Sequence, residues 1–270
     1  MILTWPDRKT CWLALLLAGA ATAAAKPPRA DAETLYRAGN LEQAETAFRQ
    51  LLVAEPDNPA DLYYLGKIAV RRGDYAGAIA RLERAGALAP RESDYQLWLG
   101  NAYAWAAATA PLRAKPALGR KCLAAYQQAL ALDQDNVSAR LGLMNFYRHV
   151  PVLMGGGLDR AYAQAEEIRR RDPDRGAIAQ AVLLGQEKKF DQAFGVLERL
   201  LARDRRNYAA NCLLGKLALA SGQRLAEGAE ALRRCLALPP TESDESHELV
   251  AGRLGQLGRK RAPAITAGDI

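Results

Sequence analysis

Residues that could form a catalytic or metal centre are scarce in this chain. Its 270 residues include only two histidines, His149 and His247. Neither has the Cys, His or carboxylate neighbours at helical spacing that a metal site needs. No Cys–His pair or Ser, His and Asp set suggests a hydrolase, and the many carboxylates are scattered along expected helix surfaces. The sequence therefore predicts a protein that is not an enzyme and has neither a cofactor nor a metal site.

Strand-forming patterns and aromatic residues are also rare. Few segments show the Val, Ile and Thr alternation of a strand, whereas Ala, Leu, Glu, Arg and Gln are abundant, so the chain is predicted to be all-α. The formal net charge is +7, but basic residues alternate with acidic ones, as in residues 166–172 and 203–206. A nucleic-acid interface needs a basic face with base-stacking rings. We therefore expect no nucleic-acid partner and a modest preference for acidic partners.

The first 25 residues have the features of a signal peptide. Arg8 and Lys9 give a basic start, residues 11–20 are apolar, and Ala23 and Ala25 fit the small-x-small cleavage rule. The apolar run is shorter than the about 20 residues that span a bilayer, and no other stretch could cross one. We expect cleavage after Ala25, a periplasmic or secreted location and no integral membrane segment after cleavage; an uncleaved anchor is the alternative.

Cysteines are few, and cleavage would leave three, Cys122, Cys212 and Cys235. An oxidising compartment permits a disulfide, and Cys212 and Cys235 fall on the two helices of one expected hairpin. Cysteine also occurs at small apolar positions simply as a packing residue. Both interpretations of this pair stay open, and Cys122 is predicted to be buried and free.

A fixed spacing of apolar residues runs through the rest of the chain. Each copy has a small residue, a larger apolar residue four positions later, a third about three after that, and then Pro or Asp. One copy begins at Ala44 and the next at Ala78, 34 residues later. Repetition at this period predicts stacked helical hairpins rather than a closed globule.

Two of the expected hairpins carry insertions, at residues 104–117 and 150–158. The first is predicted to combine a longer first helix, through Trp105, with a proline-kinked loop. The second contains Gly155, Gly156 and Gly157 before an expected helix. No Lys-Ser/Thr follows, which excludes a phosphate-binding loop of the nucleotidase type. An expanded turn that needs positive φ angles is the simpler interpretation, and a partner-contacting loop is the alternative.

Residues 59–92 resemble the tetratricopeptide repeat (TPR) family, with Leu65, Gly66, Ala78, Leu82 and Pro90 at the offsets of its signature. The resemblance covers residues 31–258. It implies a right-handed superhelix of about six helical hairpins plus a closing helix near residues 245–258, between a linker at 26–30 and a disordered tail at 259–270. TPR proteins bind other proteins, and the chain is also similar to exported bacterial TPR proteins.

In TPR arrays the first helix of each hairpin lines the inner surface. Aligning the units places eight candidate partner-binding residues there: Tyr63, Lys67, Arg71, Asn101, Trp105, Asn145, Arg148 and Lys216. Asn101 and Asn145 share one repeat position and could pair with both backbone groups of an extended peptide. Lys67, Arg71 and Arg148 could hold acidic groups. The Lys/Asn/Asn/Lys/Arg clamp of chaperone-binding TPR domains is not matched, because the next unit offers Ile178 and Val182.

These features predict a non-catalytic scaffold or adaptor that docks a protein segment in its concave groove. One alternative is an assembly factor for the envelope or a surface structure. Another is a glycan-binding or enzyme-accessory subunit. In it, Trp98 and Trp105, seven residues apart on one helix face, would hold a sugar, although both could instead be core residues.

Overall fold

The computed structural model describes residues 28–240 and 245–261 of the chain. The predicted signal peptide, residues 26–27 of the predicted linker and most of the predicted tail lie outside this range. The described residues form thirteen α-helices and one short 3-10 helix, without a strand, which confirms the all-α prediction. Six helix pairs and a closing helix also agree with the predicted number of hairpins.

The helices follow one another with short connections. Their bounds, in chain order, are α1 (Arg29–Arg37), α2 (Leu41–Ala54), α3 (Pro59–Arg72), α4 (Tyr75–Leu88), α5 (Ser93–Thr109), α6 (Lys115–Leu132), α7 (Val137–His149), the 3-10 helix η1 (Val152–Met154), α8 (Leu158–Arg171), α9 (Pro173–Gln186), α10 (Phe190–Arg203), α11 (Tyr208–Ser221), α12 (Leu225–Leu236) and α13 (His247–Arg261).

Three boundaries differ from the expected ones. Helix α1 begins at Arg29, inside the expected linker, because Pro28 stands directly before its first turn. Helix α13 continues to Arg261, so the first residues of the expected tail are helical. The insertion at 104–117 mostly lengthens α5 and α6. Pro116 lies in the first turn of α6 rather than in a loop. The N–H groups of a first turn make no hydrogen bond within the helix, so a proline there costs none.

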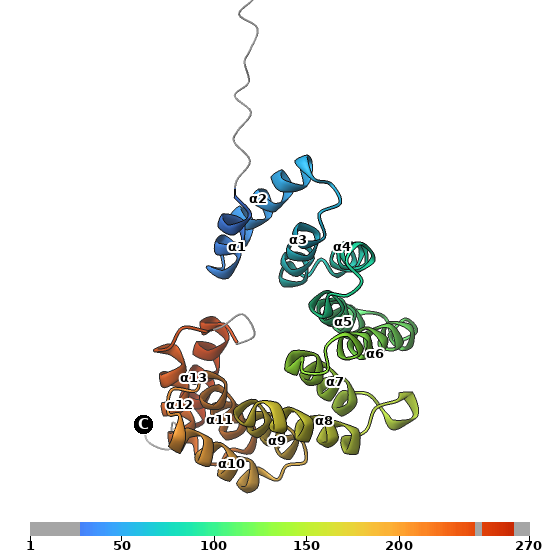
Figure 1. The fold of residues 1–270 in the computed structure, drawn as a ribbon. Coiled ribbons are helices and arrows are strands. Elements are labelled where there is room, and N and C mark those ends of the chain that lie inside the picture. Colours follow the sequence, from blue (N-terminus) through green and yellow to red (C-terminus); the bar gives the residue numbers. More distant parts are fainter. Residues whose placement is uncertain (1–27, 241–244, 262–270) are drawn as a thin grey trace, which may run out of the picture.

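The hairpins stack along an arc that curves around an open centre (Figure 1). Helices α3, α5 and α7 lie on the inner side of the arc, and their partners α4, α6 and α8 lie on the outer side. Helices α3 and α5 each contact their own partner and the next inner helix. The molecule is an α-solenoid in which apolar surface is buried between neighbouring units rather than in one central core.

Side chains and glycines fix where these helices begin and end. Several helices are capped by an Asn or Asp side chain that accepts hydrogen bonds from backbone N–H groups of the first turn, which have no partner within the helix. These caps are Asn58, Asp74, Asn136, Asp172 and Asn207. Gly73 and Gly222 end α3 and α11 in the left-handed conformation that glycine adopts most readily.

Large side chains of the outer helices pack directly on glycines of the inner helices. The ring of Tyr126 on α6 lies between Gly100 on α5 and Gly142 on α7. A β-carbon would stand 2.6 Å from this ring at Gly100 and 2.5 Å at Gly142. Tyr126 is 3% exposed, and its hydroxyl donates a hydrogen bond to Asn101 Oδ1 at 2.7 Å. The two glycines therefore set the distance between two consecutive units.

The triple-glycine turn has the conformation expected from its sequence. Gly155 and Gly157 have φ angles of 90° and 128°, which confirms the predicted positive φ. A β-carbon at Gly156 would lie 1.7 Å from the carbonyl oxygen of Val150. The backbone of Gly157 also donates to the Tyr147 carbonyl at 2.8 Å. The turn between α7 and α8 is therefore a defined structure that side chains larger than hydrogen would disrupt.

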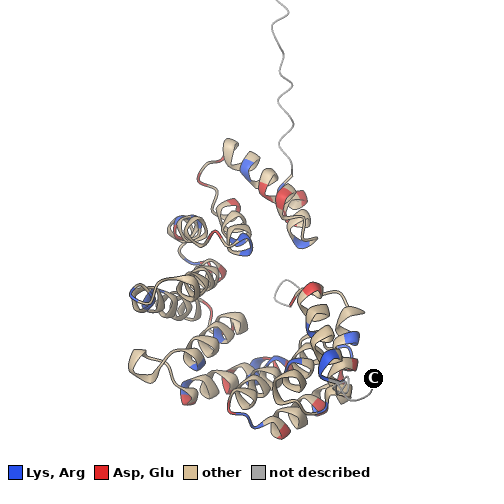
Figure 2. Cartoon of the chain, turned by 180° about the vertical axis from the view of Figure 1, so that it is seen from behind, with Lys and Arg blue, Asp and Glu red and all other residues tan. Residues whose placement is uncertain are grey.

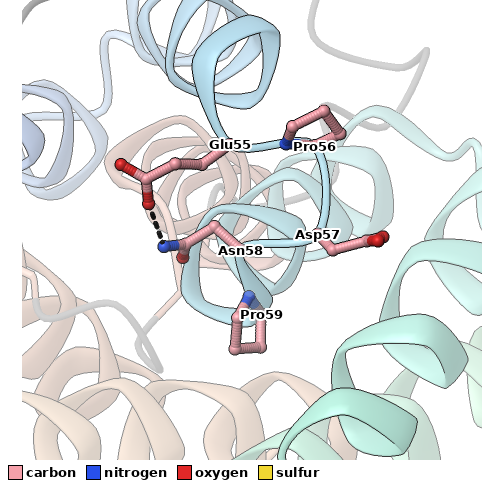
Figure 3. A pocket seen from close by; sticks show the side chains of 5 residues that line it. All are labelled: Glu55, Pro56, Asp57, Asn58 and Pro59. Carbon is pink, nitrogen blue, oxygen red and sulfur yellow. Dashed lines mark hydrogen bonds between the residues drawn. The ribbon is translucent and has the colours of Figure 1, made fainter.

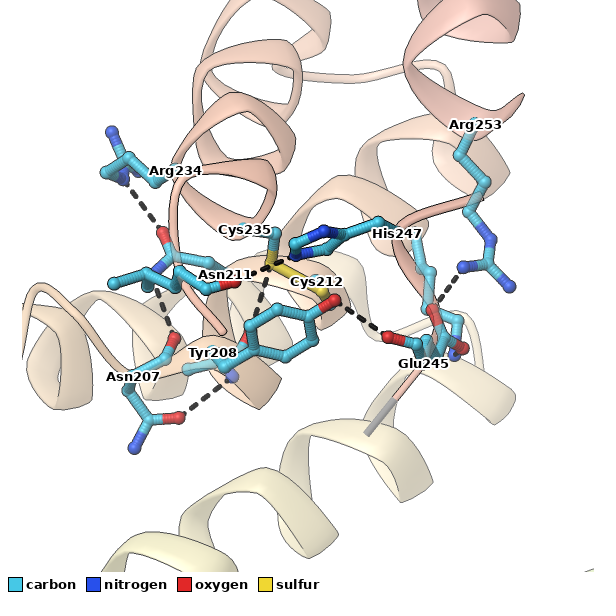
Figure 4. The surroundings of a disulfide bond; sticks show 12 residues. Asn207, Tyr208, Asn211, Cys212, Arg234, Cys235, Glu245, His247 and Arg253 are labelled. Carbon is cyan, nitrogen blue, oxygen red and sulfur yellow. Dashed lines mark hydrogen bonds and ion pairs between the residues drawn. A yellow bond between two sulfur atoms is a disulfide. The ribbon is translucent and has the colours of Figure 1, made fainter. Parts of the chain in front are cut away.

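A disulfide joins Cys212 on α11 to Cys235 on α12, with a Cα–Cα distance of 6.2 Å (Figure 4). It crosslinks the two helices of the sixth hairpin, which answers the alternative that the sequence leaves open. Around it, Tyr208 donates to the Glu245 carbonyl at 2.7 Å and so attaches the closing segment to the hairpin. Cys122 is buried and free, as predicted, and burial raises the pKa of its thiol to about 12.

Gly142→Ala is expected to destabilise the chain by about 1–3 kcal/mol, because the added methyl group must displace the enclosed Tyr126 ring. The measurement is urea unfolding followed by circular dichroism. Gly252→Ala on α13 is the matched control, since nothing lies within 4 Å of its β-carbon position. There the same change should stabilise the helix by about 0.5–1 kcal/mol. Equal effects at both sites would contradict the packing described.

Loss of the disulfide through Cys212→Ser with Cys235→Ser is expected to lower stability by about 3 kcal/mol. The bond closes a loop with a sequence separation of 23, and this constraint acts mainly on the unfolded chain. Unfolding curves with and without a reductant measure the effect. The reductant should shift the curve of the natural chain and leave that of the double variant in place; a natural chain indifferent to reductant would contradict the crosslink.

Candidate functional site

Amide side chains occupy one repeat position on consecutive inner helices. Asn101 on α5 is half-buried, and Asn145 on α7 is exposed. The Oδ1 atom of Asn101 accepts the Tyr126 hydroxyl, and the Oδ1 atom of Asn145 accepts Arg148 Nε at 2.9 Å. Within residues 28–240 and 245–261, neither amide nitrogen has a hydrogen-bond partner. Both side chains are thus held by their oxygen atoms and keep two donor hydrogens each.

Arg148 continues this polar stretch into the next unit. One of its guanidinium nitrogens donates to Gln186 Oε1 on α9 at 3.3 Å, and Gln186 Nε2 donates to the Arg148 carbonyl at 2.8 Å. Burial lowers the pKa of Arg148. Burial and, to a lesser degree, the nearby Arg148 charge lower the pKa of His149, which favours a neutral imidazole. Asn101, Asn145, Arg148 and Gln186 therefore form a polar strip across α5, α7 and α9.

Lys67 on α3 lies inside an aromatic cluster rather than on the open surface. It is 5% exposed. Its Nζ atom lies 4.6 Å from the ring centre of Tyr36, 4.8 Å from that of Trp98, and 5.0 and 5.1 Å from those of Tyr63 and Tyr64. A cation among ring faces is stabilised by their negative potential. The structure thus gives Lys67 a packing role that the sequence did not reveal.

Tyr63 and Arg71 belong to the same cluster. Tyr63 stacks on Tyr95 with ring centres 4.7 Å apart, and the Arg71 guanidinium lies 4.5 Å from the Tyr36 ring centre. Arg71 is exposed and Tyr63 is half-buried. The first three predicted site residues, Tyr63, Lys67 and Arg71, are therefore brought together, but they contact rings of the first three hairpins.

The two tryptophans of α5 have different surroundings. Trp98 is half-buried beside Lys67 and packs on the core of the third hairpin. Trp105 is 56% exposed and stacks nearly parallel to Tyr75, with ring centres 6.5 Å apart. One of the pair is thus partly core, as the packing interpretation allowed, and the other offers an aromatic surface.

Lys216 on α11 is far along the chain from the polar strip and has its own acidic partner. It forms an ion pair with Glu245, which also pairs with Arg253 of α13. Glu245 precedes the closing helix, so these pairs join the last helix to the sixth hairpin. All four predicted cations, Lys67, Arg71, Arg148 and Lys216, therefore have internal partners.

Two surface depressions in the described part of the chain are not lined by any of the predicted site residues. One is formed by Glu55, Pro56, Asp57, Asn58 and Pro59 in the connection from α2 to α3, where Asn58 Nδ2 donates to Glu55 at 2.9 Å (Figure 3). Five consecutive residues line it, so it does not gather groups from several helices. A second lies between α9 and α10 and is lined by side chains that include Gln180 and Arg199.

The described part of the chain contains no group of three or more His, Cys, Asp or Glu residues placed to hold a metal ion. None of the described helices combines the length and apolar character needed to cross a bilayer. Lys and Arg residues are interspersed with Asp and Glu residues along the stack, as the colours in Figure 2 show. What this region offers a ligand is an extended inner face with polar and aromatic side chains.

Comparison with known proteins identifies the family. The tetratricopeptide repeat family matches residues 29–86, 63–106 and 178–243, which together span just over half of the 270 residues. The chain belongs to the tetratricopeptide repeat family. No curated protein matches this TPR protein in sequence.

Solved structures extend the likeness to the fold. A TPR protein from Parabacteroides merdae ATCC 43184 has a TM-score of 0.65 at 15% identity, over 85% of this chain and 82% of its own. A thermophilic TPR protein from Thermus thermophilus has a TM-score of 0.61 at 20% identity, over 72% of this chain and 96% of its own. MamA from Desulfovibrio magneticus RS-1 has a TM-score of 0.50 at 15% identity, over 68% and 99%.

The TPR alignment selected residues on the first helices of the hairpins but did not identify their partners. Tyr36, Tyr64 and Gln186 were not among the predicted site residues, although they surround Lys67 or bind Arg148. Tyr64 directly follows Tyr63 on α3. Gln186 lies on α9, the first helix of the unit after that of Arg148. A search for aromatic residues on adjacent inner helices would have found the cluster around Lys67.

Proposed function

We propose that this TPR protein is an exported scaffold that binds an extended segment of another protein along its inner face. TPR folds serve protein–protein interaction, and the polar strip is the part of this face best suited to a peptide backbone. The observation that carries the proposal is the pair Asn101 and Asn145. Both present donor hydrogens from the same repeat position on successive inner helices.

Spacing and preorganisation both favour backbone recognition. An extended peptide offers carbonyl oxygens at regular intervals, and stacked repeats offer side chains at regular intervals. Tyr126 fixes Asn101, and Arg148 fixes Asn145, so neither amide needs to be ordered when a segment binds. Side chains that are already fixed lose less conformational entropy on binding, which favours affinity.

An acidic segment is the preferred partner in this proposal because the chain carries a formal net charge of +7, which attracts acidic partners at long range. The inner cations contribute less than their number suggests, since each is engaged by rings, an amide or a carboxylate. We therefore assign specificity to the amides and the association rate to the overall charge.

The scaffold is proposed to be non-catalytic. TPR proteins generally act by holding other proteins, and the described residues contain no group of three or more His, Cys, Asp or Glu placed to hold a metal ion. The partner could belong to envelope or surface-structure assembly, which would give the same binding mechanics a biological setting. The exposed ring of Trp105 favours a second candidate, a glycan-binding or enzyme-accessory subunit, because sugars stack on such rings.

Asn101→Asp combined with Asn145→Asp is expected to weaken partner binding by about tenfold or more, because two donor groups are lost and charges face carbonyl oxygens. The acceptor atoms for Tyr126 and Arg148 remain, so the fold should be preserved. Affinity capture from an envelope extract identifies the partner, and calorimetry with the purified partner measures the affinity.

Gln128→Glu on the outer helix α6 is the matched control, because it makes the same chemical change on an exposed side chain away from the strip. The control should bind as the natural chain does. Unchanged affinity in the double variant would refute the role of the amides. Loss of retention on polysaccharide in Trp105→Ala, with the amide variants unaffected, would favour the glycan alternative instead.

Export rests on the signal-peptide features of residues 1–25, and the Cys212–Cys235 disulfide supports it, since such bonds persist mainly in oxidising compartments. Expression in a bacterium should yield a periplasmic form that begins at Lys26. Mass spectrometry of the N-terminal peptide from the periplasmic fraction tests this. A cytoplasmic protein that retains Met1 would contradict the proposal.

A further inference from the structure

Exposed apolar side chains gather at one edge of the solenoid. The connections α5–α6 and α7–α8 each join the two helices of one hairpin, and these hairpins are neighbours, so both connections lie along the same edge of the stack. We call residues 110–121 and 150–157 the loop edge. Leu112, Val152, Leu153 and Met154 in it are 83%, 75%, 100% and 46% exposed.

The two parts of the loop edge are side by side. A β-carbon placed at Gly155 would lie 4.0 Å from Leu123 Cδ2 on α6, and one at Gly119 would lie 3.9 Å from Phe146 on α7. Figure 1 shows the connection from α7 to α8 extending away from the helices. The stacked pair Trp105 and Tyr75 lies at the same end of the hairpins, in the last turn of α5 and at the start of α4.

The apolar tip is held rigidly rather than left to collapse onto the helices. Gly155 donates to the Val152 carbonyl at 2.9 Å and Gly156 to the Pro151 carbonyl at 3.1 Å, which closes the backbone beneath η1. Arg160 donates to the Gly155 carbonyl at 2.8 Å from the start of α8. Leu153 is thus presented to solvent by a turn that three glycines make possible.

The charged side chains of the loop edge are all positive. No Asp or Glu occurs from residue 95 to residue 132, and none from 136 to 158. The first stretch contains Arg113, Lys115, Arg120 and Lys121, and within the described residues none of these four forms an ion pair. The carboxylates that bound the two stretches along the chain are Asp94, Asp133, Asp135 and Asp159. Glu83 on α4 accepts a hydrogen bond from Tyr103, and the Lys121 Nζ atom lies 5.2 Å from the centre of that tyrosine ring.

From these observations we infer that the loop edge docks on an anionic lipid surface. A protruding apolar tip can enter the boundary between headgroups and acyl chains, and the cations set beside it can pair with lipid phosphates. Trp and Tyr rings are favoured at the same depth. The four other hairpins have short polar turns at this edge, so the solenoid would touch the surface through its third and fourth units and leave its inner face open.

A local probe tests this docking independently of residues 1–25. The full chain with Cys11→Ser and Leu153→Cys is labelled with an environment-sensitive fluorophore at position 153, since Cys122 is buried and the other two cysteines are paired. Vesicles of equimolar phosphatidylcholine and phosphatidylglycerol should shift its emission to the blue. Acyl chains that carry a quencher should reduce the emission. A label on Val53→Cys, an exposed apolar position on α2, should do neither.

Charge dependence provides a second readout. Changing Arg113, Lys115, Arg120 and Lys121 to Gln should lower partition of the labelled chain to anionic vesicles by at least about tenfold. The matched control changes Arg91, Arg199, Arg205 and Arg206 to Gln, which removes the same charge elsewhere and should have a much smaller effect. Circular dichroism checks that both variants keep the helical fold.

Three outcomes would overturn the inference. The label at position 153 could report no shift on anionic vesicles, or an equal shift on phosphatidylcholine alone with no dependence on the four cations. The two sets of charge changes could reduce partition equally. The loop-edge changes could instead abolish binding of a protein partner while the label stays in water on every vesicle, which would make this edge a protein interface.

Discussion

Several units of this solenoid depend on close contact between a large side chain of an outer helix and a glycine of an inner helix. Tyr126 shows the principle most clearly, because one ring touches Gly100 in its own unit and Gly142 in the next. Leu82 meets Gly66 and Leu232 meets Gly215 in the same manner. Since each contact is local, apolar burial accumulates unit by unit, and the inner face does not have to supply a core. That freedom is what allows polar amides to remain there.

The repeat spacing and the TPR resemblance were sufficient to predict an all-α chain and the number of hairpins. The packing role of Gly66 and Ala78 was predictable, because small residues where two helices cross recur at fixed positions of the repeat. The aromatic surroundings of Lys67 were not predictable from such a pattern. Its ring partners come from three units, with Tyr36 31 residues before it and Trp98 31 residues after it, and their meeting depends on side-chain rotamers.

The same reasoning explains which predicted site residues keep capacity for a ligand. Cations satisfy their charge wherever rings or carboxylates are close, and Lys67, Arg148 and Lys216 each found such groups or an amide inside the array. An amide has both an acceptor and donors, so Asn101 and Asn145 can be anchored by one end and offer the other. Sequence position identified all of them as candidates, but only the geometry shows that the two amides keep donor hydrogens for a ligand while the cations are engaged within the protein.

The disulfide has a consequence for how the molecule can move. Cys212 and Cys235 belong to two helices that already pack as one hairpin, and no covalent bond links one described hairpin to another beyond the chain itself. The crosslink therefore stiffens the sixth hairpin alone. It places no covalent restraint between neighbouring hairpins, so the curvature of the arc depends on the non-covalent packing of one unit on the next.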